Sequence, residues 1–344
     1  MVSVFFPKRS YTTMKQENKK LFPQVTVMNA LLCLFVVIIH CTNAPYTELS
    51  AGTWQHIMIF SLNKLLTFCV PAFLFLSGFK LYRDSDMDIW TFYKRRLTKI
   101  VLPYIIAALI YILYFFKKGW LDGSFLEYLF LGTISAHFYY VIIAVQLYLL
   151  FPLIQWLFRK HSIATAVLSA IMTVIFSCFL YQGFWDRFFG QYIFYFVSGM
   201  LWKKHELGGK IGKFMPLAVL AYLATAIFHL RMMYFSSFYG ANYASSQIVN
   251  IAFVLLSTVL LYVISEKVLI KSKAFCATST AVSASSYSIY LYHCLLLYIL
   301  QFDVFTKFSL TCGKRFIITL TVLYSVISLY CLLNSYIKRK KIPN

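Results

Sequence analysis

The apolar stretch Val25–Thr42 carries two polar side chains that could do chemistry within a membrane. Asn29 lies near its start and His40 near its end, eleven residues later. On an α-helix this spacing is about three turns, so both groups lie on nearly the same face, roughly 16 Å apart along the axis. Polar groups inside a bilayer are costly and usually functional. The stretch alone is equally compatible with a histidine that is merely solvated at the membrane surface.

Three further apolar segments contain polar groups. Lys64 lies about seven residues inside the second apolar segment, where it either extends to the interface or acts inside the bundle. His137 opens a later segment, a position where a histidine is commonly just interfacial. His293 is deeper, with Tyr290 one turn before it and Tyr287 nearly two. A histidine at that depth needs a partner, which favours an inward-facing polar network.

Neither a metal site nor a disulfide framework is expected. No two of these histidines are four residues apart, and no acidic residue lies near them in sequence. The eight cysteines are scattered, mostly in apolar segments, and show no CxxC spacing. They are better interpreted as small buried apolar residues.

A basic run lies where another apolar segment begins. In TFYKRRLTKIVLPY the cations are Lys94, Arg95, Arg96 and Lys99. One interpretation is that they set membrane topology and contact anionic lipids. The other is that they bind a phosphorylated cytosolic ligand, because guanidinium groups match the geometry of phosphate. The run by itself favours the first interpretation.

Composition identifies a membrane protein. The chain has 344 residues, of which 60% are hydrophobic and 19% aromatic, with a mean hydropathy of +0.72. Only 12% are charged, about half of the usual fraction for a soluble domain. The net charge of +21 is divided into short clusters between apolar segments, which indicates membrane topology and not nucleic-acid binding.

The sequence predicts an all-α polytopic transmembrane bundle. Residues 1–20 form a basic cytoplasmic tail and residues 21–344 a single transmembrane domain, with the first span uncleaved. The ten expected spans are 25–42, 57–81, 98–116, 137–158, 163–181, 188–202, 213–230, 246–266, 282–302 and 314–337. The apolar segment Ser124–Ser135 is too short to cross and is expected to be interfacial or re-entrant.

The distribution of cations predicts the orientation in the membrane. With ten spans, 24 lysines and arginines lie on the side of the termini and seven on the other, with Lys64 inside a span. Cytoplasmic loops carry such an excess. Both termini are therefore expected in the cytoplasm, with His40 at the outer leaflet of the cell membrane. We see no internal repeat and no pair of broken helices in matching halves, such as many transporters have.

Five segments, in order, resemble the acyltransferase-3 family of integral-membrane acyltransferases, especially the branch that modifies surface polysaccharides. They are VVIIH at the end of the first span, VPAFLFLSGF in the second, FYKRRLTKIVLPY before the third, AHFYYVIIAVQLYLLFP in the fourth and SSYSIYLYHCLL late in the chain. Each is weak alone, but the five together run along most of the chain.

The resemblance implies transfer of an acyl group, commonly acetyl, to a hydroxyl of an extracytoplasmic glycan or glycolipid. Acyl-CoA, commonly acetyl-CoA, would be a co-substrate, with no bound cofactor. His40 maps onto the family's catalytic histidine, and a base with a pKa near 7 suits activation of a sugar hydroxyl. The family usually has arginine eleven residues earlier, where this chain has Asn29. Lys64 is then a candidate replacement cation.

Geometry and chemistry suggest further roles for the other residues. CoA is too polar to cross, so its phosphates would dock on the cytoplasmic run Arg95–Lys99 while its acyl end extends inward. Lys64 or a tyrosine could stabilise the negative charge on the thioester oxygen.

Two rival functions stay open. A transporter or flippase of a glycan precursor would use His40 and His293 to line its path, and a non-catalytic family member would explain Asn29. Thioester turnover distinguishes the enzyme from both. The sequence does not specify the acceptor, the acyl group or the oligomeric state.

The predicted topology can be tested by labelling. Cysteines introduced at Thr47 and Lys307 should react with a membrane-impermeant maleimide on intact cells, because both positions are expected outside. A cysteine at Lys204 should react only after the cells are opened. Labelling of Thr47→Cys and Lys307→Cys only from the cytoplasmic side would contradict the orientation.

Overall fold

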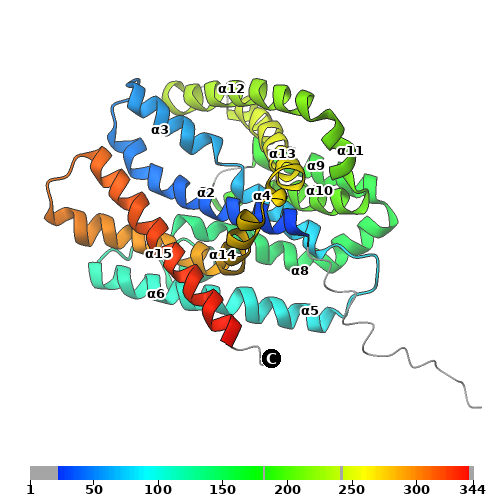
Figure 1. Cartoon of the computed structure of the whole chain (residues 1–344), viewed down its shortest axis with the longest axis horizontal. Coiled ribbons are helices and arrows are strands. Elements are labelled where there is room, and N and C mark those ends of the chain that lie inside the picture. The colour runs from blue at the N-terminus through cyan, green and yellow to red at the C-terminus, as the bar shows by residue number, and fades with distance from the viewer. Residues whose placement is uncertain (1–21, 181–182, 241–242, 341–344) are drawn as a thin grey trace, which may run out of the picture.

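The computed structural model describes residues 22–180, 183–240 and 243–340, and these are almost entirely helical, with no β-strand among them (Figure 1). The expected tail, residues 1–20, lies outside the described residues. The α-helices are α2 (Pro23–Glu48), α3 (Trp54–Leu65), α4 (Cys69–Leu81), α5 (Ile89–Arg96), α6 (Leu102–Lys118), α7 (Phe125–Phe130), α8 (Tyr139–Lys160), α9 (Ser162–Phe179), α10 (Ile193–Lys204), α11 (Leu207–Ile211), α12 (Met215–Tyr239), α13 (Tyr243–Lys267), α14 (Lys273–Ile299) and α15 (Cys312–Lys340). Short π segments, η2 (Leu97–Val101) and η8 (Leu300–Val304), continue α5 into α6 and extend α14. The 3₁₀ turns are η3 (Ala136–Phe138), η4 (Gly183–Arg187), η5 (Phe189–Gln191), η6 (Gly212–Phe214), η7 (Leu269–Lys271) and η9 (Phe305–Lys307).

Nine helical segments in the described part of the chain are long and apolar enough to cross a membrane. They confirm the all-helical polytopic fold, although ten spans were expected. The difference lies at residues 188–202, where the chain first forms η5 and then α10, which has only 12 residues. A lipid-facing span needs about 20 residues. The shorter α10 is not one of the nine, yet it runs along α4 to its end, where Lys203 Nζ donates to the carbonyl of Tyr82. Ser124–Ser135 is also short, with the six-residue α7 started by a capping box between Ser124 and Glu127.

Close packing buries the short α10 against α4. A Cβ at Gly78 of α4 would clash with the carbonyl of Phe196, and one at Gly199 of α10 with the carbonyl of Phe75. Because lipid tails are as apolar as the side chains, helices in membranes associate through such close backbone approach at small residues. This close contact at the two glycines explains how α10, which is shorter than a lipid-facing span, is held inside the bundle.

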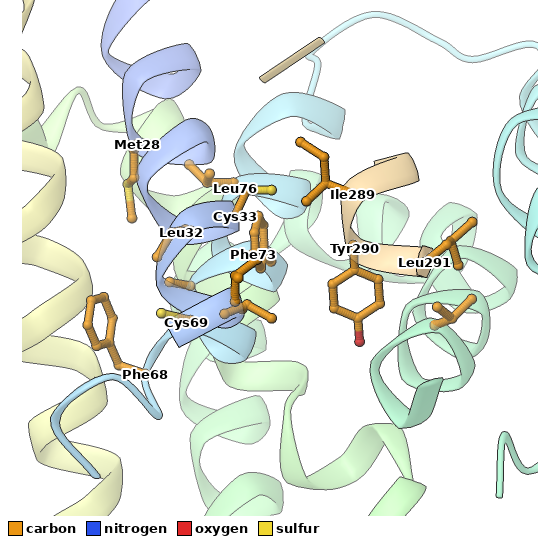
Figure 2. Packing of buried hydrophobic residues seen from close by; sticks show 14 of the residues in the cluster. Met28, Leu32, Cys33, Phe68, Cys69, Phe73, Leu76, Ile289, Tyr290 and Leu291 are labelled. Atoms are coloured by element: carbon orange, nitrogen blue, oxygen red, sulfur yellow. The ribbon is translucent and has the colours of Figure 1, made fainter. Parts of the chain in front are cut away.

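Helix α2 runs through the middle of the bundle and contacts α3, α4, α13, α14 and α15 (Figure 1). In the buried cluster of Figure 2, Leu32 and Cys33 of α2 lie beside Phe73 and Leu76 of α4, and Tyr290 of α14 lies on the other side of Phe73. At one end of the bundle, Asn29 of α2 hydrogen-bonds α14.

Other polar contacts locate the two ends of the described chain. Asn334, near the end of α15, donates to Ser285, so the start of α2 and the end of α15 lie at the same end of α14. At the opposite end, Arg315 pairs with Glu48. Both described ends of the chain therefore lie at one end of the bundle, and the side of the membrane stays a prediction from charge.

The α4–α10 contact predicts a stability effect. Gly78→Ala should lower the melting temperature in detergent, because the added methyl meets backbone that cannot move aside easily, at a cost of about 1–3 kcal/mol. Gly209→Ala is the matched control, since a Cβ there meets nothing within 4 Å. Equal melting temperatures for Gly78→Ala and wild type would show that the two helices separate without cost.

Candidate functional site

A stripe of mostly polar residues on α14 and its extension η8 faces the centre of the bundle. Its members recur every three or four residues, the spacing that places side chains on one face of a helix. They are Ser283, Ser286, Tyr287, Tyr290, His293, Cys294, Leu297 and Gln301. Since α14 packs along α2, this stripe runs from the region of Asn29 to the region of His40.

Three histidines from three parts of the chain meet at one end of this stripe. The ring centroids lie 5.0 Å apart for His40 and His293, 5.8 Å for His40 and His137, and 5.1 Å for His137 and His293. His137 and His293 are only 1% and 4% exposed. The expectation that His137 is interfacial is therefore wrong, because the turn η3 directs its ring into the bundle.

Two of the three rings have fixed orientations. His293 Nδ1 lies 3.0 Å from the carbonyl of Ile289 and 2.9 Å from that of Tyr290, so this nitrogen carries the proton and donates it. Its Nε2 is then an acceptor, 3.3 Å from Cys294 Sγ. The network expected around this histidine is thus made with backbone carbonyls and its own neighbour.

His137 is held by a chain of hydroxyl groups. Its Nε2 lies 3.4 Å from the carbonyl of Leu291, and its Nδ1 lies 2.9 Å from Ser135 Oγ. Tyr298 in turn lies 3.1 Å from the same oxygen. Tyr290 donates to the carbonyl of His137. Both nitrogens of this imidazole are therefore occupied.

His40 differs from the other two. Among the described residues, no group hydrogen-bonds its ring nitrogens, and the side chain is partly exposed. It lines a cavity of about 270 Å³ together with Asn43, Thr47, Ser135 and Gln301. A second cavity, of about 30 Å³, also reaches His40. An imidazole without hydrogen-bond partners at the wall of a cavity can exchange a proton with a molecule bound there.

The fold also brings together potential metal ligands that are separated in sequence. The ligand atoms of His40, His293 and Cys294 lie within 4.8 Å of one another. Zinc bonds to nitrogen and sulfur are only about 2.0–2.3 Å long, so atoms separated by the full 4.8 Å would have to move closer together to share an ion. The expectation of no metal, which rested on spacing in the sequence, stays a prediction.

Asn29 anchors the other end of the stripe. Its Nδ2 donates to Ser283 Oγ and Ser286 Oγ, both at 3.0 Å, and the residue is 7% exposed. Its Oδ1 accepts from Lys80 Nζ at 3.3 Å. In the sequence Lys80 is only one of the cations on the side of the termini, because nothing there shows that the end of α4 meets α2.

The cation proposed as a replacement for the missing arginine lies elsewhere. Lys64 Nζ lies 5.5 Å from the ring centroids of Tyr46 and Phe60. Tyr46 is in the last turn of α2, seventeen residues beyond Asn29, which is about 26 Å along the helix. Lys64 therefore cannot act beside Asn29, and the neighbouring cation is Lys80.

The basic run separates into two kinds of residue. Lys94, Arg95 and Lys99 are exposed, whereas Arg96 turns inward. Its guanidinium carbon lies 5.0 Å from the ring centroids of both Phe92 and Tyr148, and its Nε has no hydrogen-bond partner.

Local structure fixes where Arg96 points. Asp88 caps the start of α5 by accepting from the backbone of Trp90 and Thr91. The π segment η2 follows Arg96 directly, and such segments often mark functional positions.

Tyrosines span the distance between Arg96 and the histidines. Tyr148 lies against Arg96, and its hydroxyl is 3.3 Å from Ser77 Oγ. Tyr140, about two turns earlier on α8, lies 5.2 Å from the ring of Tyr290, which lies 5.4 Å from that of His137. The spacing in SSYSIYLYH indicated the α14 part of this path, but no sequence signal pointed to its partners on α8.

The chain was compared with known proteins. A family model described as an acyltransferase domain matches residues 22–337, nearly the whole chain. Comparison with curated proteins and with solved structures found no significant match. The family model covers the histidine cluster, Asn29 with Lys80 and, to within one residue, all nine candidate spans of the described residues. The chain is therefore a multi-pass membrane protein that belongs to the acyltransferase-3 family.

Proposed function

We propose that this protein is an O-acyltransferase that moves an acyl group, most simply acetyl, from cytosolic acyl-CoA to a hydroxyl of an extracytoplasmic glycan or glycolipid. The observation that carries the proposal is the imidazole of His40, which has no hydrogen-bond partner among the described residues and lies at the wall of a cavity that also contains polar side chains. This cavity lies at the end of the bundle opposite Asn29 and Lys80. If the donor and the acceptor come from opposite sides of the membrane, their binding sites must lie at opposite ends of the bundle, as these two groups of residues do.

In the proposed reaction His40 is the general base. The imidazole takes the proton of the acceptor hydroxyl while the oxygen attacks the thioester carbonyl. Collapse of the tetrahedral intermediate breaks the carbon–sulfur bond, and the CoA thiolate receives the proton from the imidazolium. The hydroxyl of Tyr298 lines the same cavity, and by turning its O–H away from Ser135 Oγ it would donate to the negatively charged oxygen of the intermediate.

The polar residues of the cavity suit a sugar. Asn43 and Thr47 follow His40 by one and two turns on α2, and Gln301 faces them from η8. Amide and hydroxyl groups can hydrogen-bond sugar hydroxyls without adding charge. We assign these three residues to the acceptor.

On the donor side, the proposal gives Arg96 the main role among the basic residues. It is the member of the run that turns inward, and its unpartnered Nε leaves a donor for a phosphate oxygen. The exposed Lys94, Arg95 and Lys99 suit anionic lipid headgroups and long-range attraction of CoA.

His40→Ala tests the base. Turnover of acetyl-CoA by purified protein with a glycan acceptor should fall by about 10²–10⁴-fold, the usual effect of losing a general base. Expression and donor binding should persist, because His40 makes no protein hydrogen bond. His161→Ala, at an exposed histidine between α8 and α9, should turn over normally.

His137→Ala should behave differently from His40→Ala. It removes a buried, hydrogen-bonded ring and should lower the melting temperature more.

Full activity in His40→Ala would end the catalytic assignment. A wild-type protein that turns over no thioester donor, yet moves a glycan precursor across vesicles, would indicate a transporter.

Arg96→Gln tests the donor dock. Calorimetric titration with CoA should show binding weakened by about 1.5–3 kcal/mol, the range for hydrogen bonds to charged groups. The double variant Arg95→Gln/Lys99→Gln, matched in chemistry but exposed, should lose less, and its loss should shrink at high salt. If folded Arg96→Gln protein binds CoA with wild-type affinity, the basic run serves only membrane topology and lipid contact and does not bind the donor.

A further inference from the structure

We propose that Lys80, oriented by Asn29, binds the pyrophosphate group of CoA. This inference rests on the proposed function, since it assigns a second binding residue for the same donor. Four observations carry it: the fixed amide of Asn29, the absence of an acidic partner, the approach of Arg96 and the position along α2.

The amide of Asn29 has no freedom to turn. Both of its Nδ2 hydrogens are used by Ser283 and Ser286, which leaves Oδ1 directed at Lys80 Nζ. An ammonium group has three donors, and this contact uses one. The side chain of Lys80 is exposed although its neighbours Phe79 and Leu81 are buried, and in the proposal its two remaining donors bind the ligand.

No carboxylate neutralises Lys80. In the described part of the chain its ammonium forms no ion pair, and the acidic residues after α4 have other partners. Asp84 accepts from the Tyr82 hydroxyl, Asp86 pairs with Arg159 and Asp88 caps α5. A cation at a helix–helix contact with no anion nearby is suited to an anionic ligand.

A second cation approaches the same face of α4. Ser77 precedes Lys80 by three residues, which places the two side chains on one side of the helix. The Ser77 hydroxyl contacts Tyr148, whose ring lies against Arg96. Two cations linked through Ser77 and Tyr148, without an acid between them, suit a ligand that carries several negative charges, and a pyrophosphate is such a ligand.

The position along α2 distinguishes the pyrophosphate from the other phosphate of CoA. Asn29 and His40 are roughly 16 Å apart along the helix axis. In CoA the extended pantetheine arm joins the pyrophosphate to the thiol, whereas the 3′-phosphate lies beyond the ribose. A pyrophosphate at Lys80 therefore directs the acyl group along the α2–α14 stripe toward His40.

Calorimetry on the full-length protein, in a detergent free of phospholipid, tests this assignment. The ligands are CoA, 3′-dephospho-CoA and pantetheine, and the variants are Lys80→Gln, Lys80→Arg and Asn29→Asp. Lys80→Gln should weaken CoA and dephospho-CoA equally, by about 10- to 100-fold, and leave pantetheine unchanged. Lys80→Arg should restore most of the affinity.

Asn29→Asp tests the positioning role without removing the lysine. It places a carboxylate at the contact with Lys80 Nζ and should weaken the same two ligands by competing with their phosphates. Lys210→Gln, at an exposed lysine outside the basic run, is the control for loss of one charge. Melting temperatures establish that each variant is folded.

The outcomes separate the inference from the proposed function. Wild-type CoA affinity in Lys80→Gln would overturn the inference and leave the proposed acyl transfer intact. Weakened pantetheine binding would show a structural role for Lys80, and a loss confined to CoA would assign Lys80 to the 3′-phosphate. Both of these also overturn the pyrophosphate assignment. A wild-type protein that binds no CoA would refute the donor and the inference together.

Discussion

The pairing of α2 with α14 is the contact on which the rest of the site depends. At one end Asn29 donates to Ser283 and Ser286, and at the other the rings of His40 and His293 lie 5.0 Å apart. Because α-helices are rigid over this length, these two contacts set the register of every residue between them. If α2 slid by one turn along α14, the imidazole of His40 would leave the cavity. The same movement would separate the amide of Asn29 from Lys80.

The two ends of the α2–α14 stripe, at His40 and at Asn29, differ in their chemistry. Around His40 the neighbouring rings are buried and hydrogen-bonded, so only one imidazole remains free to exchange a proton. At the other end, Lys80 beside Asn29 retains unused donors, and Arg96 beside Tyr148 has an Nε without a partner among the described residues. In the proposed reaction the first end handles a neutral hydroxyl and the second an anionic donor, which matches their charges.

Close backbone contact makes this arrangement possible. The glycines at α4 and α10 let α10 pack tightly against the helix that carries Ser77 and Lys80. The π segments η2 and η8 then shift the chain beside Arg96 and at Gln301. Both polar ends of the site therefore lie next to departures from regular α-helix, as is common where function constrains the backbone.

The amino-acid sequence by itself determined the membrane-bundle fold, most of the spans and the family, because apolar length, charge clusters and motif order are local properties. It also indicated His40 and His293. Only the tertiary structure decided that His137 is buried between them, that Lys80 and not Lys64 meets Asn29, and that Arg96 alone among its basic neighbours turns inward. Those facts depend on which faces of distant helices meet, and side-chain spacing along one helix contains no information about its partner.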